Sequence, residues 1–474
     1  MGIMHYLGAA AVLLLICGVG FYSGRQVKSA SDFATGGRTA GAGIVAGTII
    51  GTLVGGASTI GTAQLAFNYG FSAWWFTLGG GIGVLIMMAF YAKPLYESGI
   101  STLPQIFARE YGESSATAAT LLTSIGSFLS VVSQVISGIA LITAVSALSN
   151  GAATVLVVVL MLFYVVFGGA LGAGMVGIAK TILLYVTVGV CGILAFTSQG
   201  GLDAFVSALP VERYFNLIAR GPAADLGAGL SLVLGVLTTQ AYIQALVSGK
   251  SLRISRTGLL ISAILIPLSG IGGIFVGMYQ RLNADPAVLA DAQLAAAAAK
   301  TALPDFILDH MPPLAAGAML ATLLVAVVGT GAGVSLGIAS MFCNDVYQKR
   351  INKAASPERS MLVARLVVVV ILVGAALLTI GDMGAMILSW SFLSMGLRGA
   401  VAFGPLCTAL FLPGKIPPRF AFVSMMTGPI LVLVGKFTLP AGIDPLFLGL
   451  AGSLVVLAAG LIVGRRDRQL PLNS

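Results

Sequence analysis

Charged residues are scarce in this chain of 474 residues, at 9% of the total, and histidine occurs only twice. A soluble domain carries about 25% charged residues, so the composition excludes a soluble protein. The four cysteines lie singly inside apolar segments, which indicates neither disulfides nor a metal site. His5 and His310 fall near predicted helix ends or loops, which leaves no histidine for an intramembrane proton relay. With no catalytic constellation of His, Cys or paired carboxylates in the apolar runs, we predict neither an enzyme, nor a cofactor, nor a transition-metal site.

Apolar residues dominate the sequence, at 58% of the chain with a mean hydropathy of +1.01. A window of about 20 residues, the length of a membrane-crossing helix, divides the apolar sequence into thirteen runs. We therefore predict an all-α polytopic membrane protein with about 13 transmembrane helices. The first run has no Lys or Arg before it, so we expect a retained helix rather than a signal peptide. The runs lie near residues 5–24, 40–68, 72–92, 115–148, 151–168, 171–198, 226–248, 257–279, 313–345, 361–380, 384–413, 418–436 and 443–464.

The formal net charge of +9 comes from a one-sided distribution of basic residues. Eighteen Lys and Arg fall in or beside loops on one side of the predicted membrane, and five fall on the other. This is the positive-inside bias, which places the N-terminus outside and the C-terminus inside a cytoplasmic membrane. The basic excess is thus a topology signal and does not indicate nucleic-acid binding.

The stretch from Gly47 to Gly61 interrupts one apolar run with Gly55-Gly56 followed by Ser58 and Thr59. Glycines and hydroxyls in this pattern favour a broken helix. Lipid cannot satisfy the backbone groups that a break releases, so the break is expected where it lines a cavity for ions or a polar solute. The alternative is close helix packing through small residues, which does not require two adjacent glycines followed by two hydroxyls.

Four motifs follow one another along the chain. The first is the Gly-Gly-Ala-Ser-Thr-Ile-Gly break, and the other three read Thr102-Leu103-Pro104-Gln105 with Tyr111-Gly112, Tyr164 with Gly168-Gly169, and Ala326 through Thr330 with Asn344-Asp345-Val346-Tyr347. Their order and spacing resemble the solute:sodium symporter family over nearly the whole chain. In that family the corresponding segments are the first core helix, an inner-loop motif, the start of the fifth core helix, and the eighth core helix with its inner end.

The resemblance implies a core of five plus five helices in inverted repeats, with one extra helix before it and two after it. The sequence supports this independently, because the run at 226–248 that mirrors the broken helix is also interrupted, at Gly235 with Thr238, Thr239 and Gln240. The expected parts are an extra helix and loop over 1–39, a first repeat over 40–200 and a second repeat over 201–415. Two C-terminal helices with a short cytoplasmic tail follow over 416–474.

The resemblance also implies a sodium site, in which this chain departs from its relatives. Matching residue by residue gives first-helix carbonyls at Gly51 and Val54 and eighth-helix ligands at Ala326, Gly329 and Thr330. Oxygen ligands suit a hard cation, but a serine of the family is replaced by Gly329, which removes one hydroxyl. A second sodium site of some relatives is expected to be missing, because its aspartate position is Gly177.

Lys180 lies three residues after Gly177 and is therefore expected on the same helix face. It falls about 15 Å into its helix, near the middle of the bilayer, where an unpaired ammonium is costly. Arg398 is a second cation in the middle of a predicted span, and no Asp or Glu is expected deep in any span. Each cation is thus a candidate to replace the coupling ion or to bind an anionic solute, the alternatives being snorkelling for Lys180 and pairing with helix-end carbonyls for Arg398.

The remaining candidates are polar residues near the two interruptions. Ser58 matches a position that contacts substrate in the family, although its hydroxyl can also bond to its own helix. Gln134 needs a partner, either a solute or a neighbouring helix, and Tyr242 falls where sugar-transporting relatives have an inner-gate aromatic. The predicted substrate-binding residues are Ser58, Thr59, Gln134, Thr239 and Gln240, with Tyr242 as the inner gate.

The predicted function is secondary active transport of a small organic solute by alternating access, with a carboxylate-bearing solute expected and Na⁺ or H⁺ as the coupling ion. One alternative is a sodium-independent or proton-coupled carrier in which Lys180 replaces the ion. Another is a transporter-like sensory module, which the short C-terminal tail disfavours. The expected partners are the solute and the lipid bilayer, and the expected oligomeric state is a monomer.

Overall fold

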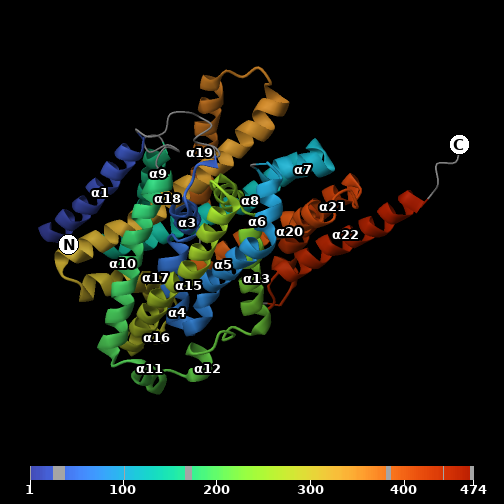
Figure 1. Cartoon of the computed structure of the whole chain (residues 1–474). Coiled ribbons are helices and arrows are strands. Elements are labelled where there is room, and N and C mark those ends of the chain that lie inside the picture. Colours follow the sequence, from blue (N-terminus) through green and yellow to red (C-terminus); the bar gives the residue numbers. More distant parts are fainter. Residues whose placement is uncertain are drawn as a thin grey trace.

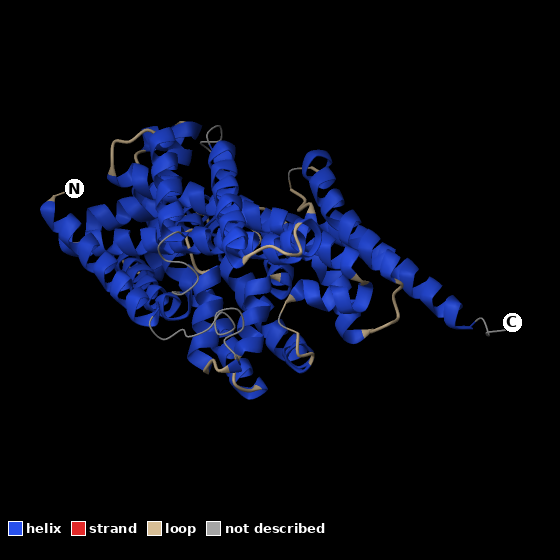
Figure 2. Cartoon of the chain, turned by 90° about the horizontal axis from the view of Figure 1, so that it is seen from above, coloured by secondary structure: helices blue, strands red, loops and turns tan. Residues whose placement is uncertain are grey.

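The computed structural model describes residues 2–24, 38–100, 102–165, 173–379, 386–440 and 442–469. These residues form helices joined by loops, without a strand among them (Figure 2). The predicted Gly168-Gly169 motif and two acidic residues expected near span ends, Asp32 and Asp382, lie outside the described residues. The all-α prediction is confirmed.

The first half of the chain contains one broken membrane helix and several continuous ones. Its elements are α1 (Ile3–Gly24), α3 (Ala42–Leu53), η2 (Ala57–Gly61), α4 (Thr62–Tyr69), η3 (Gly70–Trp74), α5 (Trp75–Ile86), η4 (Met87–Tyr91), α6 (Ala92–Glu97), α7 (Leu103–Tyr111), α8 (Glu113–Val145), α9 (Asn150–Phe163) and α10 (Ala173–Gln199). Of these, η2 and η4 are π-helical and η3 is a 3₁₀ turn.

The second half contains a second broken helix and ends in two long helices. Its elements are α11 (Leu202–Ala208), α12 (Val211–Tyr214), α13 (Pro222–Thr238), α14 (Gln240–Ser248), α15 (Leu252–Asn283), α16 (Pro286–Ala290), α17 (Ala292–His310), α18 (Pro313–Met341), η7 (Phe342–Ile351), α19 (Pro357–Thr379), α20 (Ile387–Phe411), α21 (Pro418–Thr438) and α22 (Leu446–Gln469). Figure 1 shows α1 at one end of the molecule and α21 with α22 at the other.

Nine helices of the described residues are long and apolar enough to cross a membrane, and the bent pair α13–α14 raises this to ten. Three shorter apolar helices, α1, α3 and α9, contain 10–17 residues that meet the apolar criterion. The chain is therefore a multi-pass membrane protein, while the count of thirteen spans stays a prediction. The discrepancy has a physical source at α3, because the break that follows Leu53 divides this span into short pieces.

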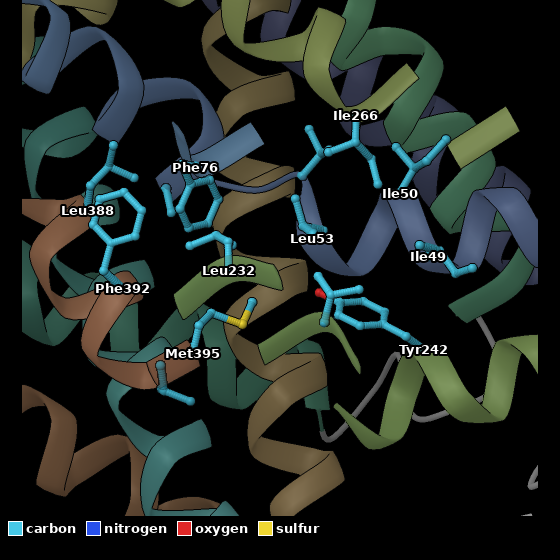
Figure 3. Packing of buried hydrophobic residues seen from close by; sticks show 14 of the residues in the cluster. Ile49, Ile50, Leu53, Phe76, Leu232, Tyr242, Ile266, Leu388, Phe392 and Met395 are labelled. Atoms are coloured by element: carbon cyan, nitrogen blue, oxygen red, sulfur yellow. The ribbon is translucent and has the colours of Figure 1, made fainter. Parts of the chain in front are cut away.

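The core lies where the broken helices meet their neighbours. Figure 3 shows side chains of α3, α13, α15 and α20 packed together, among them Ile49, Leu53, Leu232, Ile266 and Met395. Large apolar residues also cover the outside, as expected when lipid replaces water around the helices. Helix α19, for example, buries only 22% of its apolar window inside the protein.

The ends of the two broken helices are joined directly. The amide of Ala40, just before α3, donates to the carbonyl of Ser248 over 3.1 Å, and the amide of Lys250 donates to the Ala40 carbonyl over 3.0 Å. These bonds form a parallel bridge between the segment that leads into α3 and the segment that leaves α14. The bridge fixes one end of α3 and one end of α14 to each other.

The loop between α15 and α18 contains α16 and α17. Helix α17 packs against α4, α15 and α8. Lys300, which the sequence places in this loop, is only 9% exposed.

Candidate functional site

The first broken helix opens between Leu53 and Ala57. Val54 has extended backbone angles (φ −86°, ψ 100°), which ends α3. The Ser58 hydroxyl accepts a hydrogen bond from the Gly55 amide over 2.9 Å and donates one to the Gly55 carbonyl over 3.0 Å. The Thr59 hydroxyl also donates to the Gly55 carbonyl, over 2.8 Å. The two hydroxyls therefore satisfy backbone groups that the break releases, a requirement at membrane depth.

The two glycines of the break are required by close packing against α8 and α18. A Cβ atom on Gly55 would lie 2.8 Å from the Thr330 hydroxyl oxygen, and one on Gly56 would lie 2.6 Å from the Ser137 hydroxyl oxygen. The Gly56 amide donates to the side-chain oxygen of Gln134 over 3.0 Å. The partner that Gln134 needs is thus a backbone amide of the break.

Lys180 reaches the break from α10. Its side chain is buried, at 6% exposure. The ammonium donates to the Gly51 carbonyl over 2.6 Å and to the Thr330 hydroxyl over 2.9 Å. Its helix can approach α3 because glycine faces glycine, with an added Cβ on Gly51 only 3.3 Å from the Cα of Gly177. The structure therefore brings together Lys180 and two residues of the predicted ion site.

The other residues of the predicted ion site contribute no charged or hydroxyl side chain. Val54 and Ala326 are buried, and Gly329 directly precedes Thr330 in α18. A Cβ atom on Gly329 would meet the ring of Tyr164 at 3.6 Å, an ordinary van der Waals distance. The Cβ atom of a serine at this position would therefore be accommodated without displacing its neighbours.

The second broken helix bends by 50° between α13 and α14. Thr239 forms the bend, and its hydroxyl donates to the Gly235 carbonyl over 2.6 Å. The same hydroxyl accepts from the guanidinium of Arg398 over 2.8 Å. Arg398 of α20 is 5% exposed, and its other hydrogen bonds go to the Ser394 carbonyl, the Ser394 hydroxyl and the Met395 sulfur. Every one of these acceptors is electrically neutral.

Two other predicted residues near this bend contact further elements. The Gln240 side-chain oxygen accepts from the Leu103 amide over 2.7 Å, which ties the start of α14 to the loop before α7. Tyr242 is 2% exposed and packs in the apolar core with Ile49 and Leu53 of α3 (Figure 3). The structure thus joins Thr239 to Arg398, but it places Gln240 and Tyr242 against other elements.

A buried carboxylate at the start of α13 was not among the residues selected from the sequence. Asp225 is 0% exposed and forms an ion pair with Arg220 at 2.6 Å. It also accepts from the Ser72 hydroxyl over 2.6 Å and from the Arg220 amide over 2.8 Å. The sequence signal is an acidic residue in the first turn after Gly221-Pro222, but the contact with Ser72 spans 153 positions. Asp345, from the motif that resembles the eighth core helix, lies in η7. One of its carboxylate oxygens is 3.7 Å from the Lys349 nitrogen.

Two broken helices that meet around buried polar groups are characteristic of a secondary transporter. The model of the sodium:solute symporter family matches residues 33–428. The chain belongs to this family, and it is a transporter rather than an enzyme.

Relatives and solved structures agree with this assignment. The chain is 27% identical over 382 residues to the "uncharacterized symporter YwcA" of Bacillus subtilis (strain 168), covering 77% of this chain and 72% of that protein. It is 22% identical over 475 residues to the "osmoregulated proline transporter OpuE" of the same organism, covering 96% and 93%. A solved structure of a Na⁺-coupled sialic acid symporter, in a substrate-bound outward-open state, superposes with a TM-score of 0.78. That comparison covers 98% of both chains at 19% identity and shows a shared fold.

Proposed function

We propose that this chain carries a small, carboxylate-bearing solute across the membrane, with the Lys180 ammonium in the place of a sodium ion. The observation that carries the proposal is the contact of this ammonium with the Gly51 carbonyl and the Thr330 hydroxyl, at 2.6 and 2.9 Å. These two oxygens belong to the first broken helix and to α18, which the family resemblance assigns to the ion site. The ammonium between them links the first broken helix to α18, as a bound ion would.

Sodium coupling, which the name of the family favours, is opposed by the residues at this position. Gly329 supplies no hydroxyl, so one oxygen ligand of the resemblance is missing. The remaining oxygens of Gly51 and Thr330 already accept from a positive donor, and a second cation would be repelled by it. We therefore propose transport that does not depend on sodium, with proton release from Lys180 as the route to coupling with H⁺.

Arg398 supports a solute that carries a carboxylate. Its guanidinium is buried beside the bend of the second broken helix, and its hydrogen-bond acceptors are neutral. Buried charge is normally paired, so an anionic group on the solute would complete the electrostatics of this region. The relative named as a proline transporter moves a solute that bears a carboxylate, which is consistent with this choice.

A thermal-shift screen of the purified protein tests the solute class directly. Monocarboxylates and amino acids should raise the melting temperature, while neutral sugars and cationic solutes should not. Arg398→Gln should weaken the binding of the best carboxylate by about 10- to 100-fold, the range for loss of a hydrogen bond to a charged group. Lys93→Gln, which removes an exposed cation of α6, is the matched control. Stabilisation by neutral sugars or cationic solutes alone would contradict the proposal.

Proton coupling can be separated from sodium independence in the same preparation. Uptake of the best solute into proteoliposomes should continue when choline replaces sodium. If Lys180 carries the coupling proton, an inward proton gradient should accelerate uptake in the unmodified protein and not in Lys180→Gln. Acceleration by a sodium gradient instead would favour the ordinary sodium mechanism of the family.

A further inference from the structure

A pocket of about 350 Å³ opens on the surface of the molecule, at the start of α15. It lies between the first turns of α15 and the π-helical segment η4, which pack against each other. Its lining combines two arginines with apolar side chains and one hydroxyl. The lining residues are Met88, Leu252, Arg253, Arg256, Thr257 and Leu260.

The two arginines of this pocket have no protein partner within the described part of the chain. Arg253 and Arg256 are three positions apart on α15 and therefore share a helix face. Neither forms an ion pair or a side-chain hydrogen bond with another described residue. Two other basic residues on this side are engaged, since Arg38 donates to the Tyr96 carbonyl over 3.0 Å and Arg109 donates to the Ser98 carbonyl over 3.4 Å.

The position of the arginines in the first turns of α15 strengthens the preference for an anion. The N-terminal end of a helix carries partial positive charge, which disfavours a cation in this turn unless an anion is present. Lys93 of the neighbouring helix α6 is exposed and adds a further positive charge, while Glu97 at the end of α6 is the nearby acidic residue. The charge balance of α6 and the first turns of α15 is therefore positive.

An exposed apolar stripe continues from the arginines along α15. Leu260, Ile264 and Leu268 follow Arg256 at intervals of four residues, and they are 43%, 57% and 51% exposed. Positions four apart are neighbours on a helix face, and each such step turns the stripe by about 40° around the axis, so the stripe winds from the pocket toward the membrane interior. From Arg256 to Leu268 it extends for about 18 Å, at 1.5 Å per residue. A long acyl chain matches this stripe, whereas a free anion would leave it without an occupant.

We propose that this pocket binds one anionic phospholipid, with its headgroup phosphate between Arg253 and Arg256 and an acyl chain along Leu260, Ile264 and Leu268. Basic pockets between membrane helices bind anionic headgroups by the same chemistry. Arginine suits this role because its planar group donates two hydrogen bonds to a phosphate. The lining of this pocket includes neither Lys180 nor Arg398. The lipid proposal therefore does not depend on which solute is transported.

Native mass spectrometry of the full-length protein in detergent tests the proposal. The probes are phosphatidylglycerol and phosphatidylcholine with identical acyl chains, and inorganic phosphate alone. We expect one phosphatidylglycerol to be retained more tightly than phosphatidylcholine, and inorganic phosphate not to displace it at equal concentration. A basic side chain near an anionic lipid contributes about fivefold in affinity, so removing both arginines should weaken the preference by about 25-fold.

The decisive variant is Arg253→Gln combined with Arg256→Gln. Its matched control is Arg359→Gln combined with Arg365→Gln, which removes two exposed arginines of α19 that lie outside the pocket. A third variant, Thr257→Trp, fills the pocket while keeping both arginines, and it should lose the bound lipid. It tests the proposal independently if the double arginine variant does not fold. Equal retention of the two lipids, displacement by inorganic phosphate, or unchanged retention in Thr257→Trp would overturn the proposal.

Discussion

Replacement of Lys180 by glutamine should create sodium binding, which we propose that the unmodified chain lacks. Sodium is close in size to calcium, whose oxygen ligands lie about 2.3–2.6 Å from the ion. The Lys180 nitrogen lies 2.6 Å from the Gly51 carbonyl and 2.9 Å from the Thr330 hydroxyl. A sodium ion on these two oxygens would therefore overlap the ammonium.

Displacement of the lysine side chain would not remove the conflict. At an effective dielectric constant near 20, two unit charges about 4 Å apart repel by about 4 kcal/mol. This energy corresponds to about three decades in affinity, enough to abolish sodium binding in the millimolar range. Lys180→Gln should therefore raise sodium affinity by up to about 1,000-fold. Adding Gly329→Ser should raise it further, because a Cβ atom is accommodated there and serine supplies the missing hydroxyl.

The assay is a thermal-shift titration with sodium chloride against choline chloride at constant ionic strength. The unmodified protein and the control Lys93→Gln should respond equally to the two salts. Lys180→Gln and the double variant should be stabilised by sodium alone. Millimolar sodium binding by the unmodified protein, unchanged in Lys180→Gln, would refute the reasoning and place the ion elsewhere.

Three further predictions concern topology, the first broken helix and the loop between α21 and α22. A reporter fused after Ser474 should report cytoplasm and a tag at exposed Gln293 should react from outside; the reverse would overturn the assigned orientation. Gly56→Ala should lower the unfolding free energy by about 1–3 kcal/mol through overpacking against α8, while Gly333→Ala, with no atom within 4 Å of the new Cβ, should not. Burial raises the pKa of Asp444, so the folded state holds its proton to higher pH than the unfolded state. The free energy of unfolding should thus fall as the pH rises from the pKa of Asp444 in the unfolded state to its pKa in the folded state. Asp444→Asn should remove this fall, and the melting temperature measured against pH tests it.

The sequence predicted the position of Lys180 because two local rules were sufficient. Helical spacing placed it on the face of Gly177, and the family resemblance placed that face at the ion site. The hydrogen bonds of Lys180 to Gly51 and Thr330 required the structure, because they depend on how closely α3 and α10 approach. The helical class and the first break were likewise predictable from apolar runs and from paired glycines.

Long-range polar contacts could not be predicted from the sequence. Gln240 was predicted to bind substrate from its place beside the second interruption, but it accepts from Leu103, which is 137 positions away. The cluster of Ser72, Arg220 and Asp225 was missed for the same reason. Periodicity reveals which face of a helix a residue occupies, but it does not reveal which other helix lies against that face.

The most direct test of the central claim is uptake of the best-binding carboxylate by the unmodified protein in proteoliposomes, with sodium or choline as the sole monovalent cation. If the Lys180 ammonium occupies the ion position, the initial rate should be the same in both solutions. A rate that rises steeply with sodium and vanishes in choline would contradict the account.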